Sequence, residues 1–304
     1  MPPIPPPDAS GFTTSTEVPL YWVTYGPAEA PPVLVLHGGP GAHHDYLLPQ
    51  MLALAEGRRL VLYDQRGGGR SRSDDHRTPI TWRTHVEDLA RAATELELDP
   101  LTIVGYSWGG LLALLYALAA RRGEVAPPPV RLALIDPAPV TRQYRRSLEA
   151  ELARRQAAPA IVAMREELAA SGLRERDPEA YRQRAFELSV AGYFADPAAA
   201  RDLTPFRVTG RVQQSVWESL GDFDLREELR QLDMPVLIVH GREDPIPLDS
   251  SVQAAQVLGA RLVILEGSGH VPYVERPEPL FAALERFLRE SEVNAAPAPR
   301  SATP

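Results

Sequence analysis

The chain has 304 residues, and its 40 acidic and 32 basic side chains give a net charge of −8. It contains neither cysteine nor lysine, so all of these basic residues are arginine. The two absences exclude disulfides, thiol nucleophiles, Cys-ligated metal centres, Schiff-base lysines and a P-loop lysine. The acidic balance argues against a nucleic-acid partner, because no excess of basic charge could offset the phosphates.

The sequence carries no signal for a membrane. No apolar run approaches the roughly 18 residues that would span a bilayer. The first residues, MPPIPPPDAS, lack the basic and apolar regions of a secretory signal. We therefore expect a soluble cytoplasmic protein with no membrane partner. The length and the 44% content of hydrophobic residues suit one large domain, or a core with an inserted subdomain.

Six short apolar runs predict strands that are buried on both faces of a sheet. They lie at residues 33–39, 59–64, 101–106, 130–136, 235–241 and 261–267. Apolar residues at helical spacing predict helices over 81–98 and 108–122. This alternation of strands and helices predicts an α/β fold with a mostly parallel, doubly wound sheet.

A long stretch before the fifth of these runs differs from the rest of the chain. It is charged and helical in character and has no strong strand signal. We expect helices inserted between two core strands, forming a cap over the carboxyl edge of the sheet. The expected units are a flexible Pro-rich N-terminus at 1–10, a core at 11–138 and 231–290, a helical cap at 139–230, and a flexible tail at 291–304.

The strongest local signal is GYSWGG at residues 105–110, which follows a predicted strand and opens a predicted helix. A G-x-S-x-G motif in this context predicts a sharp turn that lifts the hydroxyl of Ser107 above the sheet. Gly105 and Gly109 leave room where a side chain would clash with backbone. The helix that begins at Trp108 directs free N–H groups towards the serine. Ser107 is therefore the candidate nucleophile.

A serine nucleophile needs a general base, and seven histidines compete for that role. His270 lies in the loop EGSGH after the last predicted strand, at the sheet edge where ligands bind in such folds. Four others fit packing, capping or loop-holding roles: His37, His76, His85 and His240. His43 and His44 lack a second, spaced set of ligands, so we expect no metal site there.

An acid should orient the base, and two amides should hold the oxyanion of an acyl-transfer intermediate. Asp244, in HGREDPIP after a predicted strand, is the favoured acid. Its rivals are Glu243 and Asp249. One oxyanion donor is the N–H of Trp108, which follows the nucleophile. The other should come from HGGPG at 37–41, with Gly39 favoured over Gly38, because Pro40 has no N–H.

Five motifs together are more specific than any of them alone. They are HGGPG at 37–41, YDQRGGGRS at 63–71, GYSWGG at 105–110, GREDP at 241–245 and GSGH at 267–270. This set resembles the prolyl iminopeptidase family of α/β-hydrolases, which includes the tricorn-interacting aminopeptidases. The resemblance implies an α/β-hydrolase core, a helical cap, and Ser107, Asp244 and His270 as a catalytic triad. It also implies release of an N-terminal residue, often proline, from short peptides, without metal or organic cofactor.

An aminopeptidase must also bind a protonated α-amine, and a buried cation needs a carboxylate partner. The tricorn-interacting branch uses a Glu directly after the catalytic Asp, where this chain has Pro245. It uses another Glu in the cap, where an ungapped comparison places Gln213. Glu187 and Glu218, which lie among aromatic residues, are the candidate substrate-binding carboxylates. The alternative for each is an exposed helix carboxylate.

Two other functions stay open at this stage. The same triad could hydrolyse an ester, lactone or amide that has no free amine, and the absence of a Glu after Asp244 favours this. A non-catalytic hydrolase fold that binds a small molecule is the second alternative. We expect a small peptide or small-molecule substrate in either enzymatic case.

Overall fold

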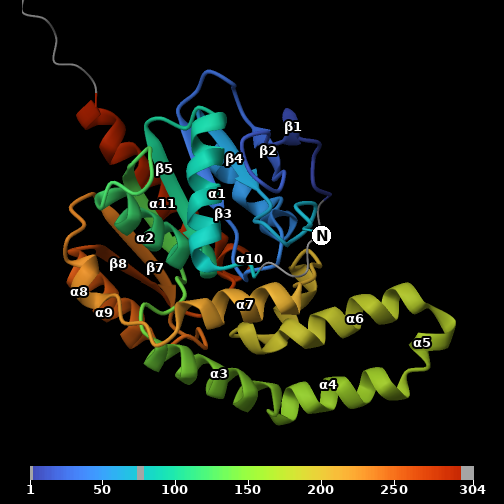
Figure 1. The fold of residues 1–304 in the computed structure, drawn as a ribbon. Coiled ribbons are helices and arrows are strands. Elements are labelled where there is room, and N and C mark those ends of the chain that lie inside the picture. Colours follow the sequence, from blue (N-terminus) through green and yellow to red (C-terminus); the bar gives the residue numbers. More distant parts are fainter. Residues whose placement is uncertain (1–2, 74–78, 296–304) are drawn as a thin grey trace, which may run out of the picture.

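The computed structural model describes residues 3–73 and 79–295. In this part of the chain, eight strands form one sheet in the order β1-β2-β4-β3-β5-β6-β7-β8 (Figure 1). Their bounds are β1 (Ala9–Phe12), β2 (Tyr21–Tyr25), β3 (Pro32–Leu36), β4 (Arg59–Tyr63), β5 (Leu101–Tyr106), β6 (Pro129–Ile135), β7 (Val236–Gly241) and β8 (Arg261–Leu265). β2 is antiparallel to β1 and β4, whereas the pairs from β4 to β8 are parallel. The predicted α/β fold is confirmed.

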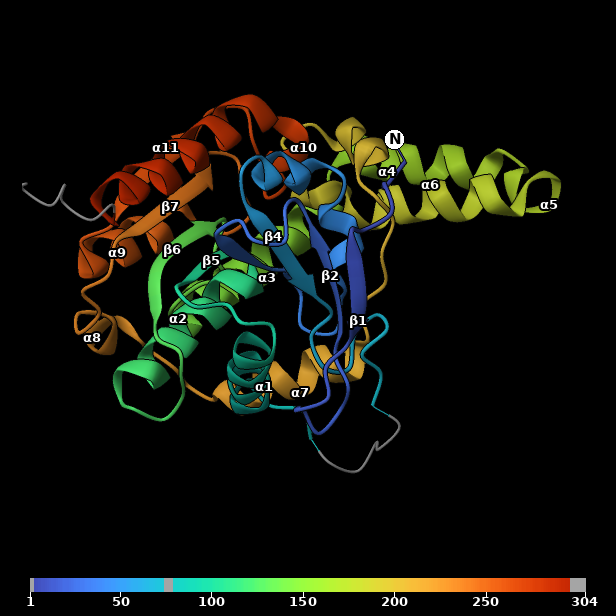
Figure 2. The same ribbon diagram turned by 90° about the horizontal axis from the view of Figure 1, so that it is seen from above.

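Helices cover both faces of this sheet (Figure 2). One face carries α1 (Trp82–Glu95), α2 (Trp108–Arg121), α8 (Arg226–Leu229) and α9 (Leu248–Leu258). The other carries η1 (His44–Leu47), η2 (Gln50–Ala55), α10 (Pro272–Glu275) and α11 (Pro277–Ala295). No helix among the described residues is long and apolar enough to cross a membrane.

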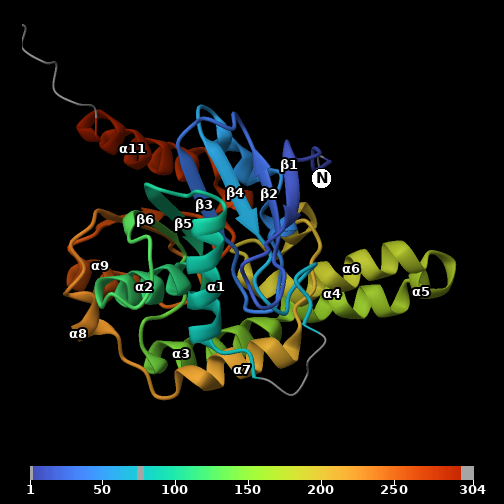
Figure 3. The ribbon, with the colours of Figure 1, turned by 45° about the horizontal axis from the view of Figure 1, so that its top comes forward.

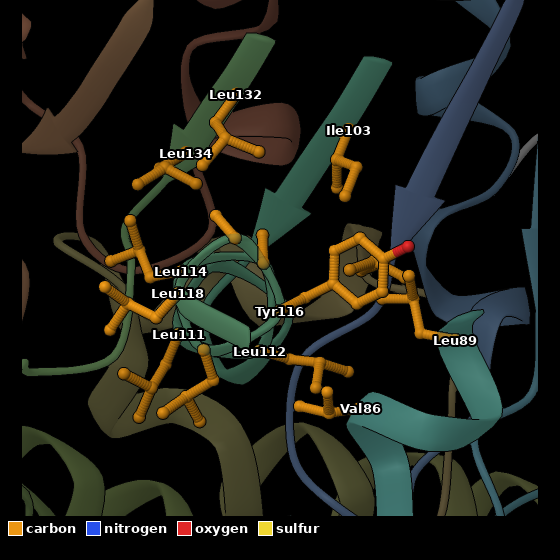
Figure 4. Packing of buried hydrophobic residues seen from close by; sticks show 14 of the residues in the cluster. Val86, Leu89, Ile103, Leu111, Leu112, Leu114, Tyr116, Leu118, Leu132 and Leu134 are labelled. Carbon is orange, nitrogen blue, oxygen red and sulfur yellow. The ribbon is translucent and has the colours of Figure 1, made fainter. Parts of the chain in front are cut away.

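The helix α2 is the centre of the first layer, and twelve of its residues are buried. In Figure 4, Leu112 of this helix points towards Val86 of α1, and Leu114 lies near Leu134 of β6. Tyr116 lies between Ile103 of β5 and Leu89 of α1. Each fully buried leucine contributes about 1.5–3 kcal/mol relative to an exposed one. This packing explains why the sequence of α2 is apolar nearly all round, and it fixes the helix that begins directly after Ser107.

An inserted helical region separates β6 from β7, as the sequence predicts. It contains α3 (Arg142–Gln156), α4 (Pro159–Ala170), α5 (Leu173–Arg176), α6 (Pro178–Val190), η3 (Ala191–Tyr193), η4 (Pro197–Asp202) and α7 (Gly210–Leu220). We call this region the insert. α4, α5 and the start of α6 project away from the core as an arm, whereas α3 and α7 lie below the sheet edge in Figures 1 and 3.

The two ends of the chain are more structured than the sequence suggests. Residues 9–10 belong to β1, although they lie in the segment that we expect to be flexible. Asp8 N–H donates to Thr24 O at 2.9 Å, and its side chain accepts from Gly26 N–H at 2.7 Å. α11 continues to Ala295, past the expected core boundary at 290. Residues 1–2 and 296–304 of the expected flexible ends, and His76, lie outside the described residues.

Candidate active site

Ser107 occupies the sharp turn between β5 and α2. Its φ of 53° and ψ of −118° form a strained conformation for a residue other than glycine. The turn is possible because its neighbours have no side chains. A Cβ on Gly105 would lie 2.6 Å from Gly109 O, and one on Gly109 would lie 2.2 Å from Leu36 O. The two glycines of the motif therefore allow α2 to approach β3 and β5 closely.

A chain of two polar contacts links Ser107 to two residues from other loops. Ser107 Oγ lies 2.9 Å from His270 Nε2, and His270 Nδ1 lies 2.7 Å from Asp244 Oδ2. His270 and Asp244 are buried, and Ser107 is partly exposed. The three residues follow β5, β7 and β8, so parallel strands bring them to the same edge of the sheet.

The loop that carries His270 is held on both sides of the residue. His270 N–H donates to Tyr193 O of the insert at 2.7 Å, and Tyr106 Oη donates to His270 O at 2.9 Å. The rings of Tyr106 and Tyr193 lie 5.3 and 5.4 Å from the imidazole. Core and insert thus fix the orientation of the imidazole together.

Burial sets the electrostatics of this contact chain. Loss of solvation lowers the pKa of His270 to about 4, so the imidazole is neutral near neutral pH. Loss of solvation also raises the pKa of Asp244 to about 7, against hydrogen bonds that include one from Ile246 N–H at 2.6 Å. A neutral imidazole beside a hydroxyl can accept its proton, which is the state that general-base catalysis requires.

Two backbone segments lie beside Ser107, the loop after β3 and the start of α2. Gly38 is packed so closely that a Cβ there would lie 2.8 Å from Ser107 Cβ. Gly38 N–H already donates to Tyr46 Oη at 2.6 Å. Gly39 and Trp108 line the pocket at Ser107. Within the described part of the chain, no backbone carbonyl accepts from the N–H of Gly39 or of Trp108.

The pocket around Ser107 has a volume of about 380 Å³. Its walls are largely aromatic, with Tyr46, Tyr106, Tyr193, Phe206, Trp217 and Tyr273 among the lining residues. Arg145 brings a positive charge to this lining, and the described lining includes no carboxylate. Arg145 stacks over Trp217 at 3.9 Å and pairs with Glu149 at 2.8 Å.

Glu187 and Glu218 do not line this pocket. Glu187 is buried on α6, where it accepts from Arg184 at 2.5 Å and Gln183 at 3.1 Å. Glu218 accepts from Gln214 at 2.7 Å and borders an outer groove beside α3. The structure therefore does not bring either candidate carboxylate to Ser107.

Several residues at the site were not found by sequence reasoning. Arg145 and Tyr46 gave no recognisable signal, since only their approach in space reveals them. Asp136 did give one, because it ends a predicted strand at the same sheet edge as Ser107. Gln213, noted in the sequence as the residue at the cap position, does line the pocket.

The motif YDQRGGGRS supports the loops next to the pocket. Asp64 accepts from His44 Nδ1 at 2.6 Å and from Arg70 N–H at 2.8 Å. Arg66 forms a two-pronged contact with Asp88, at 2.7 and 2.8 Å. His44 thus serves a structural hydrogen bond.

One cluster among the described residues has the spacing of metal ligands. It comprises Asp136, His240 and Asp244, whose donor atoms lie within 4.8 Å of one another. Both nitrogens of His240 are already used, with Ser251 Oγ at 2.9 Å and Ile246 O at 3.1 Å. Both oxygens of Asp244 also have partners. The cluster fits a metal poorly, because both nitrogens of His240 and both oxygens of Asp244 already have partners and only Asp136 Oδ2 has none among the described residues.

The fold and the serine elbow define a class of protein. A family model described as the alpha/beta hydrolase fold matches residues 31–277, so the chain belongs to the α/β-hydrolase fold family. Within that family, it is 30% identical to the proline iminopeptidase of Levilactobacillus brevis over 290 residues. That alignment covers 88% of this chain and 92% of the relative. The chain is related to the proline iminopeptidases, and the resemblance seen in its motifs is confirmed.

Solved structures agree on the fold. The proline iminopeptidase of Mycobacterium smegmatis superposes with a TM-score of 0.68 at 23% identity, covering 94% of this chain and all of that one. A proline iminopeptidase-related protein of Thermus thermophilus gives a TM-score of 0.69 at 24% identity, covering 92% of this chain and 97% of that one. At such identities the likeness establishes the architecture, and substrate choice depends on the site.

Proposed function

We propose that this protein is a serine hydrolase that cleaves small amide or ester substrates through an acyl-enzyme on Ser107. The observation that carries the proposal is the contact chain from Ser107 Oγ to His270 and Asp244, at 2.9 and 2.7 Å. Nucleophile, base and orienting acid in this arrangement are the recurring machinery of acyl transfer.

In the proposed mechanism, Ser107 Oγ attacks the substrate carbonyl while His270 Nε2 takes the hydroxyl proton. His270 then gives that proton to the leaving group, and Asp244 holds the Nδ1–H of the imidazole. The amides of Gly39 and Trp108 hold the oxyanion, and each such donor is worth about 2.7–4 kcal/mol in the transition state. Water activated by His270 releases the acyl group. This sequence of steps requires no metal or organic cofactor.

For the substrate, we propose release of an N-terminal residue, with proline preferred, from short peptides. The related proline iminopeptidases support this assignment, because the alignment with them spans most of both chains. The aromatic pocket of about 380 Å³ suits a prolyl ring. Residues 139–230 would act as a cap, since Arg145, Tyr193 and Trp217 of this region form part of the pocket wall.

A second candidate is hydrolysis of esters or amides that have no free amine. The charges of the pocket favour it, because the described lining contains Arg145 and no carboxylate. A buried α-ammonium without a carboxylate partner would be costly. Glu187, one of the two candidates from the sequence, is instead paired with Arg184.

One substrate panel separates these candidates. We would measure hydrolysis of Pro-, Ala- and Leu-arylamides, N-acetyl-Pro-arylamide and a p-nitrophenyl ester. The aminopeptidase proposal expects fast cleavage of Pro-arylamide and little of its acetylated form. Cleavage of the acetylated amide as fast as that of Pro-arylamide, or faster, supports the second candidate.

The Ser107→Ala variant tests the mechanism shared by both candidates. It should lower kcat by a factor on the order of 10⁶, because the nucleophile is lost while the fold is kept. Circular dichroism and thermal unfolding would verify the fold of the variant. Unchanged turnover in Ser107→Ala would exclude the acyl-enzyme, and a wild-type protein that binds the substrates without turnover would indicate a non-catalytic binder.

A further inference from the structure

A second carboxyl group lies next to Asp244, inside the protein. Asp136 follows β6 directly, has a φ of 42°, and is fully buried. Its N–H donates to Val239 O at 2.8 Å, and its Oδ1 accepts from Gly241 N–H at 2.8 Å. These bonds hold a left-handed backbone conformation that is uncommon outside glycine, and they fix where the Asp136 carboxyl lies.

The other carboxyl oxygen of Asp136 is left without such a bond in the described part of the chain. Oδ2 is buried, and it has no hydrogen-bond donor among the described residues. One carboxyl oxygen of Asp136 and one of Asp244 lie within 4.8 Å of each other. Two ionised carboxylates have no proton to share, so a hydrogen bond between them requires one of them to be protonated.

No cation beside Asp136 in the described structure offsets a second negative charge. His240 Nδ1 lies 3.6 Å from Asp136 Oδ1, but burial lowers the pKa of His240 to about 4 and leaves it neutral. The other titratable groups that face Asp136 are His270, Tyr106 and Tyr273, from the loop after β8, from β5 and from α10. The charges of Arg155 and Glu275 act on Asp244 in opposite directions. Since the described structure places no cation beside Asp136, burial disfavours ionisation of both carboxyls at once.

The hydrogen bonds decide which carboxyl keeps the proton. Asp244 accepts from Ile246 N–H at 2.6 Å and contacts His270 Nδ1 at 2.7 Å. Asp136 accepts one backbone bond, from Gly241. Burial, followed by the charge of Asp244, raises the pKa of Asp136 well above its ordinary value. Donors favour the ionised form, so the charge belongs on Asp244 and the proton on Asp136.

We propose that Asp136 is a neutral carboxylic acid that donates a hydrogen bond from Oδ2 to the carboxylate of Asp244. It is a positioning residue: it touches neither substrate nor Ser107, and it keeps Asp244 ionised and aligned with His270. Its catalytic consequence rests on the proposed function, because it acts through the proposed triad. Its protonation state does not depend on that function.

Infrared spectroscopy tests the protonation state directly. The wild-type protein near neutral pH should show the carbonyl stretch of a neutral, buried carboxylic acid. Asp136→Asn should lose this band. Glu243→Gln is the matched control, because it removes a carboxyl one residue from Asp244 that accepts from Ser268 N–H at 3.0 Å. A band that survives in Asp136→Asn, or is missing from the wild type, overturns the proposal.

The pH dependence of Ser107 reactivity tests the positioning role. A fluorophosphonate reports the activated serine without knowledge of the substrate. Asp136→Asn keeps a neutral donor. The acid limb of its labelling rate against pH should therefore match that of the wild type. Asp136→Leu removes the donor and should raise the pKa of Asp244. Its acid limb should move to higher pH, and its labelling rate near neutral pH should fall roughly 10- to 100-fold, as expected for loss of a bond to a charged group.

The outcomes separate the two proposals. If Ser107 of the folded wild type does not react with the fluorophosphonate, the proposed function fails, while the infrared band still decides the state of Asp136. If Ser107 reacts but Asp136→Asn shifts the acid limb as far as Asp136→Leu does, the neutral-donor role is overturned. Asp136→Leu is interpreted only where its circular dichroism matches the wild type, and Asp136→Asn carries the test if it does not.

Discussion

At the scale of single residues, the interior location of Asp136, Asp244 and His270 determines their chemistry. Water cannot solvate a charge there, so burial favours the neutral form of each group. Hydrogen bonds then decide where one negative charge remains. That charge belongs beside the imidazole Nδ1–H, where in the proposed mechanism it stabilises the imidazolium that forms during proton transfer.

The pH dependence of kcat/KM follows from these shifts. The active pair has a neutral His270 and an ionised Asp244, so protonation of either group reduces the rate. Burial lowers the pKa of His270 to about 4 and raises that of Asp244 to about 7. Because both groups must be unprotonated in the active pair, kcat/KM should rise with pH and reach half its maximum near the higher value, that of Asp244. Measurements of kcat/KM from below the pKa of His270 to above that of Asp244 test this. A half-maximum near the pKa of His270 would show that protonation of Asp244 does not reduce the rate.

The residues of the contact chain could be predicted because each belongs to a local motif. Ser107 has glycines at fixed spacing, and Asp244 and His270 end loops after apolar strands. The roles of the candidate substrate-binding carboxylates, Glu187 and Glu218, could not be predicted in this way, because they depend on residues that are close only in space. The spacing of Arg184 and Glu187 on one helix face does indicate their ion pair in retrospect. Nothing local indicates that Arg145 reaches the pocket.

At the scale of elements, the serine turn depends on how closely α2 approaches the strands. The carbonyls of Leu36 and His37 lie against Gly109, so the helix N-terminus has no room for a methyl group. These contacts are with backbone, which cannot rotate out of the way. The position of Ser107 is therefore built into the packing of α2 on β3 and β5.

The variant Gly109→Ala should be strongly destabilised. Its Cβ would lie 2.2 Å from Leu36 O and 2.7 Å from His37 O, so the strand or the helix must shift. We expect a loss of about 1–3 kcal/mol in the free energy of unfolding, as for overpacked cores. Urea denaturation measures it.

Gly210→Ala is the control for this variant. A Cβ there meets nothing within 4 Å, and the residue begins α7, where alanine favours the helix. Its unfolding midpoint should equal or exceed that of the wild type. Equal stability of Gly109→Ala and Gly210→Ala would show that the elbow tolerates a side chain.

Strand prediction succeeded for β3 to β8 and missed β1 and β2. β8 is only partly buried, but its sequence RLVIL is still a continuous apolar run. β3 to β7 are almost fully buried, so their sequences are continuous apolar runs. β1 is mostly exposed, and β2 is half-buried with polar and aromatic residues mixed. Their pairing with the sheet edge is a tertiary contact, and short sequence windows do not contain it.

At the scale of the whole molecule, the insert and the core meet at the loop that carries His270. His270 N–H donates to Tyr193 O at 2.7 Å, which joins the imidazole loop to the end of η3. The carboxylate of Glu275 extends this junction. It accepts from Gly269 N–H at 2.7 Å on the core side and from Ala195 N–H at 2.8 Å on the insert side. A movement of the insert would therefore displace the loop that carries His270.

Glu275→Ala should loosen this junction and misplace His270. Both backbone amides lose their acceptor, so kcat should fall by roughly tenfold or more, while KM changes less, because hydrogen bonds to a charged group contribute about 1.5–3 kcal/mol each. Glu275→Gln keeps one acceptor oxygen and should lie between Ala and the wild type. Glu278→Ala, which removes an exposed carboxylate nearby on α11, should leave kcat unchanged.

Limited proteolysis provides a second measurement, because a loosened insert should be cut faster in Glu275→Ala. Wild-type kcat and wild-type cleavage in Glu275→Ala would show that the insert and the imidazole loop are independent.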